Sequence, residues 1–170
     1  MTQIKPLHFK SILIACDHAA YTVKHQLVQY IESTYSVSPY NVKITDLGVY
    51  SEERVDYPDM AKKLCSKLVK SDQRDGDDQK IDQEYDGGIL LCGSGIGISI
   101  AANRHEGIRA ALCHDNYTTR MSRQHNDSNV LCAGARVVGM EVLKDMVDIW
   151  MSTEFEGGRH AMRVEKIEIQ

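Results

Sequence analysis

The chain has 170 residues, of which 42% are hydrophobic and 26% are charged, and its formal net charge is −4 at pH 7. These values predict one globular domain over residues 1–170, and the negative charge argues against nucleic acid as a partner, because a nucleic-acid surface needs a basic stripe. No apolar run reaches membrane-spanning length, so no membrane partner is expected. Five irregularly spaced cysteines and the lack of a signal-peptide pattern over residues 1–10 predict a cytoplasmic protein.

Short apolar runs alternate with amphipathic stretches from the beginning of the chain. The first run, residues 11–16, predicts a strand, and a helical pattern follows it. A second strand is expected over 42–47, and a helix with a clear apolar stripe over 57–69. Residues 71–85 are acidic and aperiodic, which predicts an exposed loop insertion without a catalytic role.

The second half continues this alternation, with strands predicted over 87–92, 108–113 and 129–132 and helices over 95–103, 116–124 and 140–151. A Gly157-Gly158 pair separates the last of these helices from a charged C-terminal arm over 159–170, expected to be helical over 159–169. Five alternations of strand and helix predict an α/β fold. The expected architecture is a single-domain three-layer α/β/α sandwich with a five-stranded, mostly parallel, Rossmann-like sheet.

Polar and glycine residues follow the predicted strands. In a parallel sheet, ligands bind beyond the carboxyl ends of the strands. The residues predicted at those ends are Asp17 and His18, the loop from Cys92 to Gly97, His114, and the segment from Gly134 to Arg136. We therefore expect the reactive side chains to gather at one edge of the sheet.

The most informative of these segments is Cys92 with the loop Gly93-Ser94-Gly95-Ile96-Gly97. Glycines allow a tight turn and bring backbone N–H groups close to a ligand. The helix that follows directs its positive dipole end to the same place, and both features stabilise a thiolate. From these neighbours alone, a reactive thiol and a buried structural cysteine remain equally open interpretations of Cys92.

The glycine loop matches neither common nucleotide-binding fingerprint. A P-loop ends in Gly-Lys-Ser/Thr, whereas Gly97 is followed by Ile98-Ser99, and the dinucleotide motif Gly-x-Gly-x-x-Gly differs from the Gly-x-Gly-x-Gly found here. A cysteine phosphatase would need an arginine where Ile98 stands. Three other motifs have structural readings beside functional ones: Asp17-His18 as a helix cap, His125-Asn126-Asp127 as a helix end, and Arg159 with Arg163 as a solvated helix face.

Six segments, taken together, resemble the ribose-5-phosphate isomerase B family, whose relatives include galactose-6-phosphate isomerase subunits. They are residues 16–18, 53–58, 86–103, 122–130, 136–139 and 156–160. The resemblance covers nearly the whole chain apart from the first ten residues and the acidic insertion. Several independent motifs in the right order are more specific than any single glycine loop.

The resemblance implies a role for each site residue. It makes Cys92 the base that moves the proton, places Ser94 beside it, and makes His125 the acid/base that opens the sugar ring. Some members use a glutamate where Ile98 stands, so this chain belongs to the cysteine type. The residues implied to bind substrate are Asp17, His18, Asn126, the backbone of Gly93, Gly95, Ile96 and Gly97, and, for the phosphate, Arg136, Arg159 and Arg163.

The implied reaction is the interconversion of D-ribose 5-phosphate and D-ribulose 5-phosphate, in the non-oxidative branch of the pentose phosphate pathway. A thiolate is a suitable base near neutral pH, loop N–H groups stabilise the enediolate, and arginines position the unreactive phosphate. No step requires a metal ion or an organic cofactor, so neither is expected.

The resemblance also implies a homodimer with its sites at the subunit interface. Two other functions remain open at this point. One is an isomerase of a six-carbon sugar phosphate, such as allose 6-phosphate or galactose 6-phosphate. The other is a non-catalytic phosphate- or nucleotide-binding module of flavodoxin-like shape.

Overall fold

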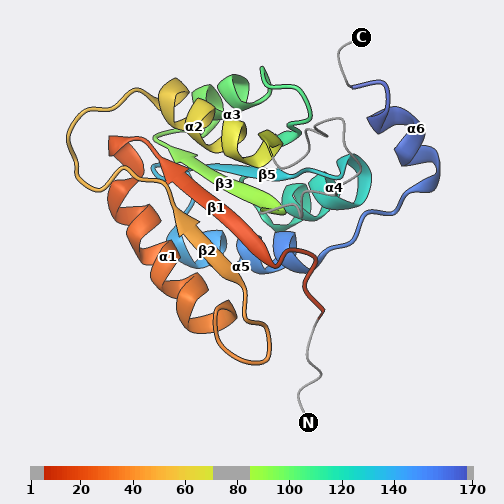
Figure 1. Cartoon of the computed structure of the whole chain (residues 1–170), viewed down its shortest axis with the longest axis horizontal. Helices are drawn as coiled ribbons and strands as arrows, with labels where there is room; N and C mark the ends of the chain where they lie inside the picture. Colours follow the sequence, from red (N-terminus) through yellow and green to blue (C-terminus); the bar gives the residue numbers. More distant parts are fainter. Residues whose placement is uncertain (1–5, 71–84, 168–170) are drawn as a thin grey trace, which may run out of the picture.

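A five-stranded parallel sheet forms the centre of the protein (Figure 1). The computed structural model describes residues 6–70 and 85–167. Its strands, in the spatial order β2-β1-β3-β5-β4, are β1 (Ser11–Cys16), β2 (Lys43–Asp46), β3 (Gly87–Cys92), β4 (Ala110–Leu112) and β5 (Val130–Gly134). Every neighbouring pair is parallel, which confirms the predicted sheet and shows it to be parallel throughout.

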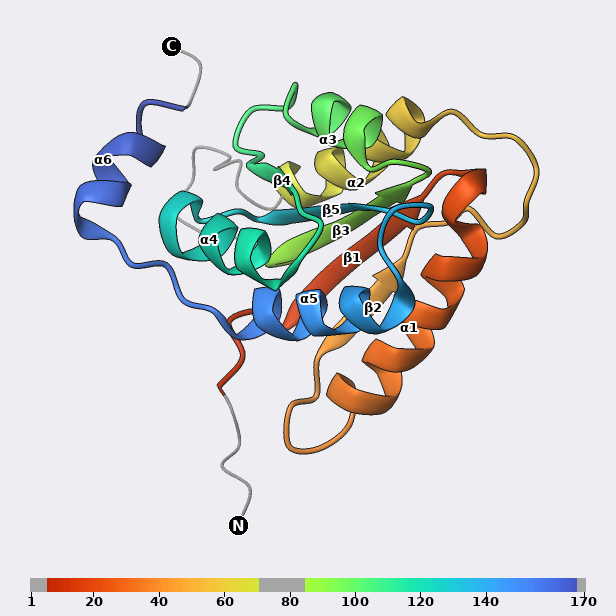
Figure 2. The same cartoon turned by 180° about the vertical axis from the view of Figure 1, so that it is seen from behind.

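Helices cover both faces of the sheet, as the three-layer prediction requires. They are α1 (Tyr21–Tyr35), α2 (Tyr57–Lys70), α3 (Ile96–Ala102), α4 (Asn116–Asn126), α5 (Met140–Ser152) and α6 (Ala161–Val164). Helices α2 and α3 lie on one face, and α1 and α5 lie on the other, with α4 packed beside α5 (Figure 2). No helix among the described residues is both long and apolar enough to span a membrane.

The core depends on close approach between β3 and the helices. Trp150 of α5 is fully buried and stacks on Phe9, with 4.0 Å between ring centroids. A Cβ added to Gly87 would lie 2.7 Å from both rings, so glycine at the start of β3 leaves the space that the aromatic pair fills. The Trp150 indole N–H donates to Ser128 Oγ at 3.3 Å and so satisfies its buried donor.

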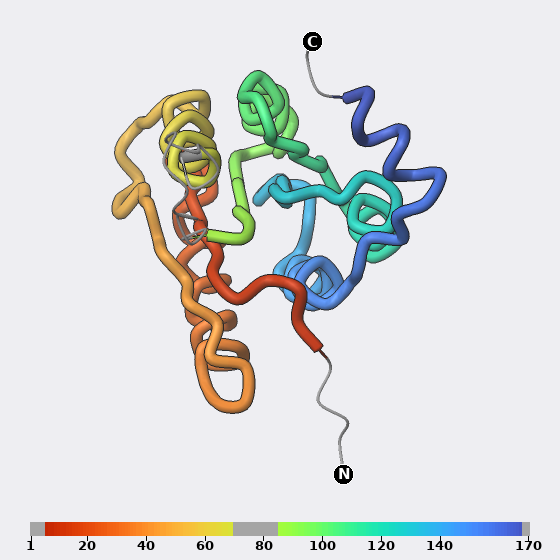
Figure 3. The backbone as a smooth tube through the Cα atoms, turned by 45° about the vertical axis from the view of Figure 1, so that its right-hand side comes forward, coloured from red at the N-terminus to blue at the C-terminus, as the bar shows by residue number. Residues whose placement is uncertain are grey.

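The C-terminal arm differs from its prediction. Instead of one helix over 159–169, a 3₁₀ turn over Gly158–His160 leads into the single turn of α6. Helix α6 has no buried residue, so no tertiary packing supports a longer helix. The arm runs along the outside of the protein next to α4 (Figure 3). Residues 168–170 of the arm, and 71–84 of the predicted acidic insertion, lie outside the described residues.

Candidate active site

The Cys92 loop forms the centre of a cluster at the carboxyl edge of the sheet. Gly95 has a φ of +79°, which a glycine adopts without strain, and its backbone N–H donates to Cys92 Sγ at 3.1 Å. The Ser94 hydroxyl accepts from the Ile96 N–H at 3.3 Å. The turn therefore aims a backbone donor at the sulfur and leaves 4% of the Cys92 surface exposed.

The other four cysteines lie in surroundings that keep them protonated. Burial raises the pKa of Cys16 to about 11 and that of Cys65 to about 12. Burial also raises the pKa of Cys113 and Cys132. These thiols therefore behave as small apolar side chains.

The end of β5 supports the loop from the neighbouring strand. The Ala135 N–H donates to Cys92 O at 2.9 Å, and the Arg136 N–H donates to Gly93 O at 3.0 Å. A Cβ added to Gly134 would lie 2.5 Å from the backbone carbon and oxygen of Ser94. Only glycine allows the two backbones to approach this closely.

A Gly134→Ala substitution is therefore expected to destabilise the protein by about 3 kcal/mol, as measured by urea unfolding, because neither backbone can yield to the new methyl group. Gly139→Ala is the control, since no atom lies within 4 Å of its added Cβ. It should cost at most about 1 kcal/mol, the difference between glycine and alanine at a helix N-cap. Equal urea midpoints of unfolding for the two variants would show that the close approach of Gly134 to the Ser94 backbone does not require glycine.

Asp17 and His18 follow β1 and lie beside the Cys92 loop, because β1 and β3 are neighbouring strands with Cys16 paired to Leu91. The Asp17 N–H donates to Leu91 O at 3.1 Å, and its carboxylate accepts from the Ala19 N–H at 3.0 Å. His18 Nδ1 lies 3.1 Å from Val55 O. The structure thus brings Asp17, His18, Cys92–Gly97 and Arg136 to one edge, as expected.

Burial raises the pKa of Asp17 above its ordinary value of 3.8, although the Ala19 N–H and the charges of His18 and Arg136 act in the opposite direction. A carboxyl whose pKa is higher in the folded state favours folding below 3.8, and that contribution is lost as the pH rises through the folded pKa. At pH 7 the ionised Asp17 therefore destabilises the folded protein.

Asp17→Asn should consequently melt at a higher temperature than the wild type at pH 7, since the amide keeps the Oδ1 acceptor for Ala19 without the buried charge. The difference should shrink below pH 3.8, where the aspartate itself becomes neutral. Scanning calorimetry of the variant and the wild type at pH 7 and pH 3 measures the difference in melting temperature at each pH. A variant that melts lower at pH 7 would show that the charge is stabilising.

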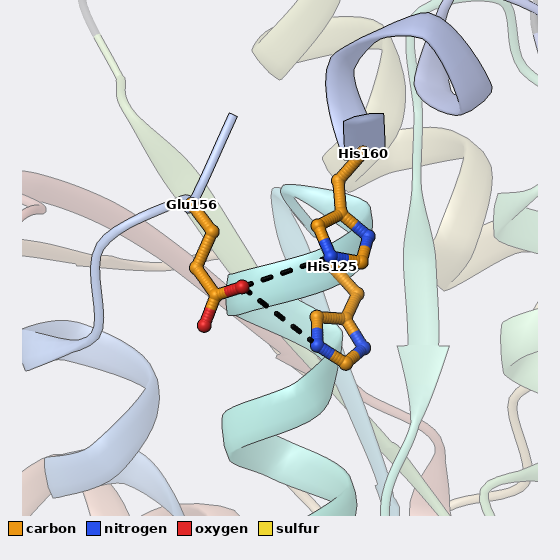
Figure 4. A group of neighbouring side chains, drawn as sticks. All are labelled: His125, Glu156 and His160. Carbon is orange, nitrogen blue, oxygen red and sulfur yellow. Dashed lines mark ion pairs between the residues drawn. The ribbon is translucent and has the colours of Figure 1, made fainter. Parts of the chain in front are cut away.

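A second cluster contains His125 at the end of α4 and two residues of the C-terminal segment, Glu156 and His160 (Figure 4). The imidazoles of His125 and His160 stack with 4.2 Å between centroids and 4° between planes. Glu156 Oε2 lies 4.0 Å from His125 Nε2 and 3.6 Å from His160 Nε2. The segment that carries Arg159 and Arg163 is thereby joined to the end of α4.

Buried charge holds the end of α4 in place. Arg123 is 1% exposed, and its Nη1 donates to Asp127 Oδ1 at 2.9 Å and to Ser128 O at 2.7 Å. Arg109 donates from Nη2 to Asp127 Oδ2 at 3.0 Å and from Nε to Asn126 O at 3.1 Å. Asp127 has a φ of +46°, so a left-handed residue clamped by two guanidinium groups ends the helix that presents His125 and Asn126.

Within one chain, the Cys92 cluster lies at the carboxyl ends of the strands and the His125 cluster lies towards their amino ends. Val130, which follows the end of α4, pairs with Gly88, whereas Cys92 is four residues further along β3. At ~3.3 Å per strand residue, Cys92 lies about 13 Å beyond that pair. The structure therefore does not bring His125, Asn126, Arg159 and Arg163 to Cys92 in one chain. Arg136 follows the carboxyl end of β5, whereas Arg163 belongs to α6, which lies towards the other end of the strands (Figure 1).

Sequence reasoning overlooked three residues at these clusters. Tyr57 covers the glycine loop, since its ring would lie 2.7 Å from a Cβ added to Gly97. Glu156 and His160 belong to a segment that carries the family resemblance, but the resemblance implies no role for either residue. Neither follows a strand, so strand-end reasoning could not identify them; the histidine beside Arg159 was the available signal.

His125, Glu156 and His160 offer the ligand types of a zinc site, and their ligand atoms lie within 4.8 Å of one another. The parallel rings, however, do not direct their in-plane lone pairs at one point. Arg159 Nε also donates to His160 Nε2 at 3.4 Å. The geometry therefore suits a network of hydrogen bonds and ion pairs better than chelation.

Comparisons with known proteins agree over nearly the whole chain. The ribose/galactose isomerase family model matches residues 12–167. Ribose-5-phosphate isomerase B of Escherichia coli strain K12 is 43% identical over 158 residues, which are 93% of this chain and 94% of that protein. D-erythrulose-4-phosphate isomerase of Pectobacterium atrosepticum is 39% identical, over 92% of each chain. 

A solved structure of a ribose 5-phosphate isomerase from Thermotoga maritima shares the fold, with a TM-score of 0.81 and 42% identity. The match covers 95% of this chain and 98% of that one. Similarity on this scale, in sequence and in structure, confirms the resemblance noted from the motifs. The chain therefore belongs to the ribose/galactose isomerase family and is an isomerase.

Proposed function

We propose that the chain interconverts D-ribose 5-phosphate and D-ribulose 5-phosphate, with Cys92 as the base. The observation that carries the cysteine mechanism is the Gly95 N–H, which points at Cys92 Sγ from 3.1 Å in a loop that joins β3 to α3. The 43% identity to a ribose-5-phosphate isomerase B over most of the chain supports the substrate. The five cysteines are free, which supports the expected cytoplasmic location.

The proposed chemistry moves one proton between adjacent carbons. In the open-chain aldose, the Cys92 thiolate takes the proton from C2, and the electron pair shifts onto the carbonyl oxygen to form an enediolate. Backbone N–H groups of the loop and the Ser94 hydroxyl stabilise the negative oxygen. A proton then passes from O2 to O1, and the thiol returns its proton to C1 as the C2=O2 double bond forms, which leaves the ketose and the thiolate.

Ring opening and phosphate binding use the second cluster. A neutral His125 takes the proton of the hemiacetal hydroxyl as the C1–O4 bond breaks, and it returns a proton to O4. Arg159 and Arg163 bind the phosphate, and Asn126 lies next to His125 at the end of α4. Because these groups and Cys92 lie at opposite edges of one chain, a complete site requires a second copy.

We therefore propose a homodimer in which the Cys92 cluster of each subunit faces the His125 cluster of its partner. Apolar surface near the loop supports this arrangement. Ile96 and Ile100, one turn apart on α3, are 52% and 62% exposed, and Tyr117 of α4 is 68% exposed. Exposed apolar side chains of this size next to a site are typical of a protein interface.

The test compares turnover of ribose 5-phosphate, allose 6-phosphate and galactose 6-phosphate by the protein before and after exhaustive chelation. The proposal expects the highest kcat/KM for ribose 5-phosphate and the same rate after chelation. A strict preference for a six-carbon substrate would favour the alternative isomerase, and a loss of activity on chelation would overturn the cofactor-free mechanism. The Pectobacterium relative is reason to add a four-carbon ketose phosphate to the panel.

The other alternative, a non-catalytic nucleotide-binding module, does not fit an isomerase family match over residues 12–167.

A further inference from the structure

Glu156 faces two imidazoles at once, and its contacts show which of them it serves. Its Oε2 lies 3.6 Å from His160 Nε2 and 4.0 Å from His125 Nε2, with the two rings stacked (Figure 4). A single carboxylate oxygen pairs with an imidazole nitrogen only where that nitrogen carries a proton. The location of the proton on each ring therefore decides the pairing.

His160 does not hold a proton on the nitrogen that faces Glu156. Arg159 Nε donates to His160 Nε2 at 3.4 Å, so this nitrogen is an acceptor and the single ring proton is on Nδ1. His160 is 5% exposed, and burial, followed by the charges of His125 and Arg159, lowers its pKa below 6.5, although the charge of Glu156 acts in the opposite direction; the neutral ring is therefore favoured. The ring N–H that remains as a partner for the Glu156 carboxylate is then that of His125.

The backbone fixes Glu156 next to His125. The Glu156 N–H donates to Gln124 O at 3.0 Å, one residue before His125. Three residues before Glu156, Thr153 O accepts from Arg123 Nε at 3.3 Å. The backbone of Glu156 is therefore fixed to the end of α4. Rotation of its half-exposed side chain is enough to shorten the distance between Glu156 Oε2 and His125 Nε2 from 4.0 Å to hydrogen-bond length.

We propose that Glu156 is a positioning residue for His125: its carboxylate holds a proton on His125 Nε2, so that Nδ1 is the nitrogen that exchanges a proton with the sugar. In Figure 4 the His125 nitrogen that faces Glu156 is Nε2, and the other ring nitrogen points away from the carboxylate. A carboxylate that fixes the imidazole tautomer in this way also fixes the ring orientation. The stacked His160 ring also restrains the orientation of the His125 ring. This inference rests on the proposed ring-opening role of His125.

The experiment compares Glu156→Ala with Glu154→Ala, which removes an exposed carboxylate two residues away on the same segment. We expect Glu156→Ala to lower kcat for ribose 5-phosphate by about 10- to 100-fold, the usual effect of removing such a partner, with an unchanged melting temperature. Glu154→Ala should stay within about twofold of wild type, since surface changes away from a site have small effects. Equal kcat values for the two variants would overturn the proposal.

The second readout does not depend on turnover. In the ¹⁵N-labelled protein, long-range ¹⁵N–¹H NMR spectra report which ring nitrogen of His125 is protonated. The Nε2–H form should dominate in the wild type and in Glu154→Ala and be lost in Glu156→Ala; the same tautomer in all three would overturn the proposal. A tautomer change in a protein that isomerises no sugar phosphate would refute the proposed function and leave the Glu156–His125 pairing intact.

Discussion

Replacing Cys92 by alanine is expected to lower kcat for ribose 5-phosphate by about 10³-fold, within the range that general acid–base groups contribute. The substitution removes the proposed base, while the loop N–H groups, Asp17 and the arginines proposed to bind the phosphate remain. KM and the melting temperature should therefore change little. Turnover is followed as ribulose 5-phosphate formation, and ligand binding by isothermal calorimetry.

Cys113→Ala is the matched control for this result. Cys113 is buried, as Cys92 is, and directly follows β4, but it lies outside the glycine loop, and burial raises the pKa of its thiol. Its alanine variant should keep kcat within about twofold of wild type, as expected for a residue away from the chemistry. A Cys92→Ala variant as active as Cys113→Ala would remove the thiol from the mechanism.

Co-expression of Cys92→Ala and His125→Ala subunits is expected to restore about one quarter of wild-type turnover. In the proposed homodimer, random pairing makes half of the dimers mixed, and each mixed dimer regains one intact site of two. The reason is structural: the Cys92 and His125 clusters lie at opposite edges of one chain, so each site would draw on both subunits. The restored rate is measured in the purified mixture against each parent variant.

The control for complementation pairs Cys92→Ala with a chain that carries both Cys92→Ala and His125→Ala. No arrangement of these two chains contains an intact site, so the mixture should be as inactive as its parents. Failure of the first mixture to gain activity, with mixed dimers shown by native mass spectrometry, would contradict the shared site.

Local pattern was sufficient to predict most of the fold. The largely buried strands β1, β3 and β5 and the apolar stripes of α2 and α5 follow from their hydrophobic patterns, which reflect burial within the sheet and against it. Periodicity could not reveal that β5 inserts between β3 and β4, because strand order depends on contacts distant in sequence. It also extended α6 too far, since charged residues at helical spacing lack the packing that stabilises a helix.

The candidate site was predictable from the sequence where its residues lie at the ends of strands. Asp17, Cys92 and Arg136 lie at the carboxyl ends of neighbouring parallel strands, so their proximity comes from the topology. The location of His125 at the opposite edge follows from the direction of α4, which runs back along the sheet before β5 begins. The contact of Glu156 with His125 joins segments that no periodic pattern relates, so only the three-dimensional structure reveals it.

The clamp on Asp127 has a consequence for how the proposed ring-opening group meets its substrate. A glycine is the usual residue for a left-handed helix end, and it would leave the last turn of α4 free to fluctuate. Here a carboxylate held by Arg109 and the buried Arg123 ends the helix instead. The conformational entropy of that turn is thereby lost once, during folding, rather than at every encounter with a sugar, so the imidazole is preorganised before the ligand arrives.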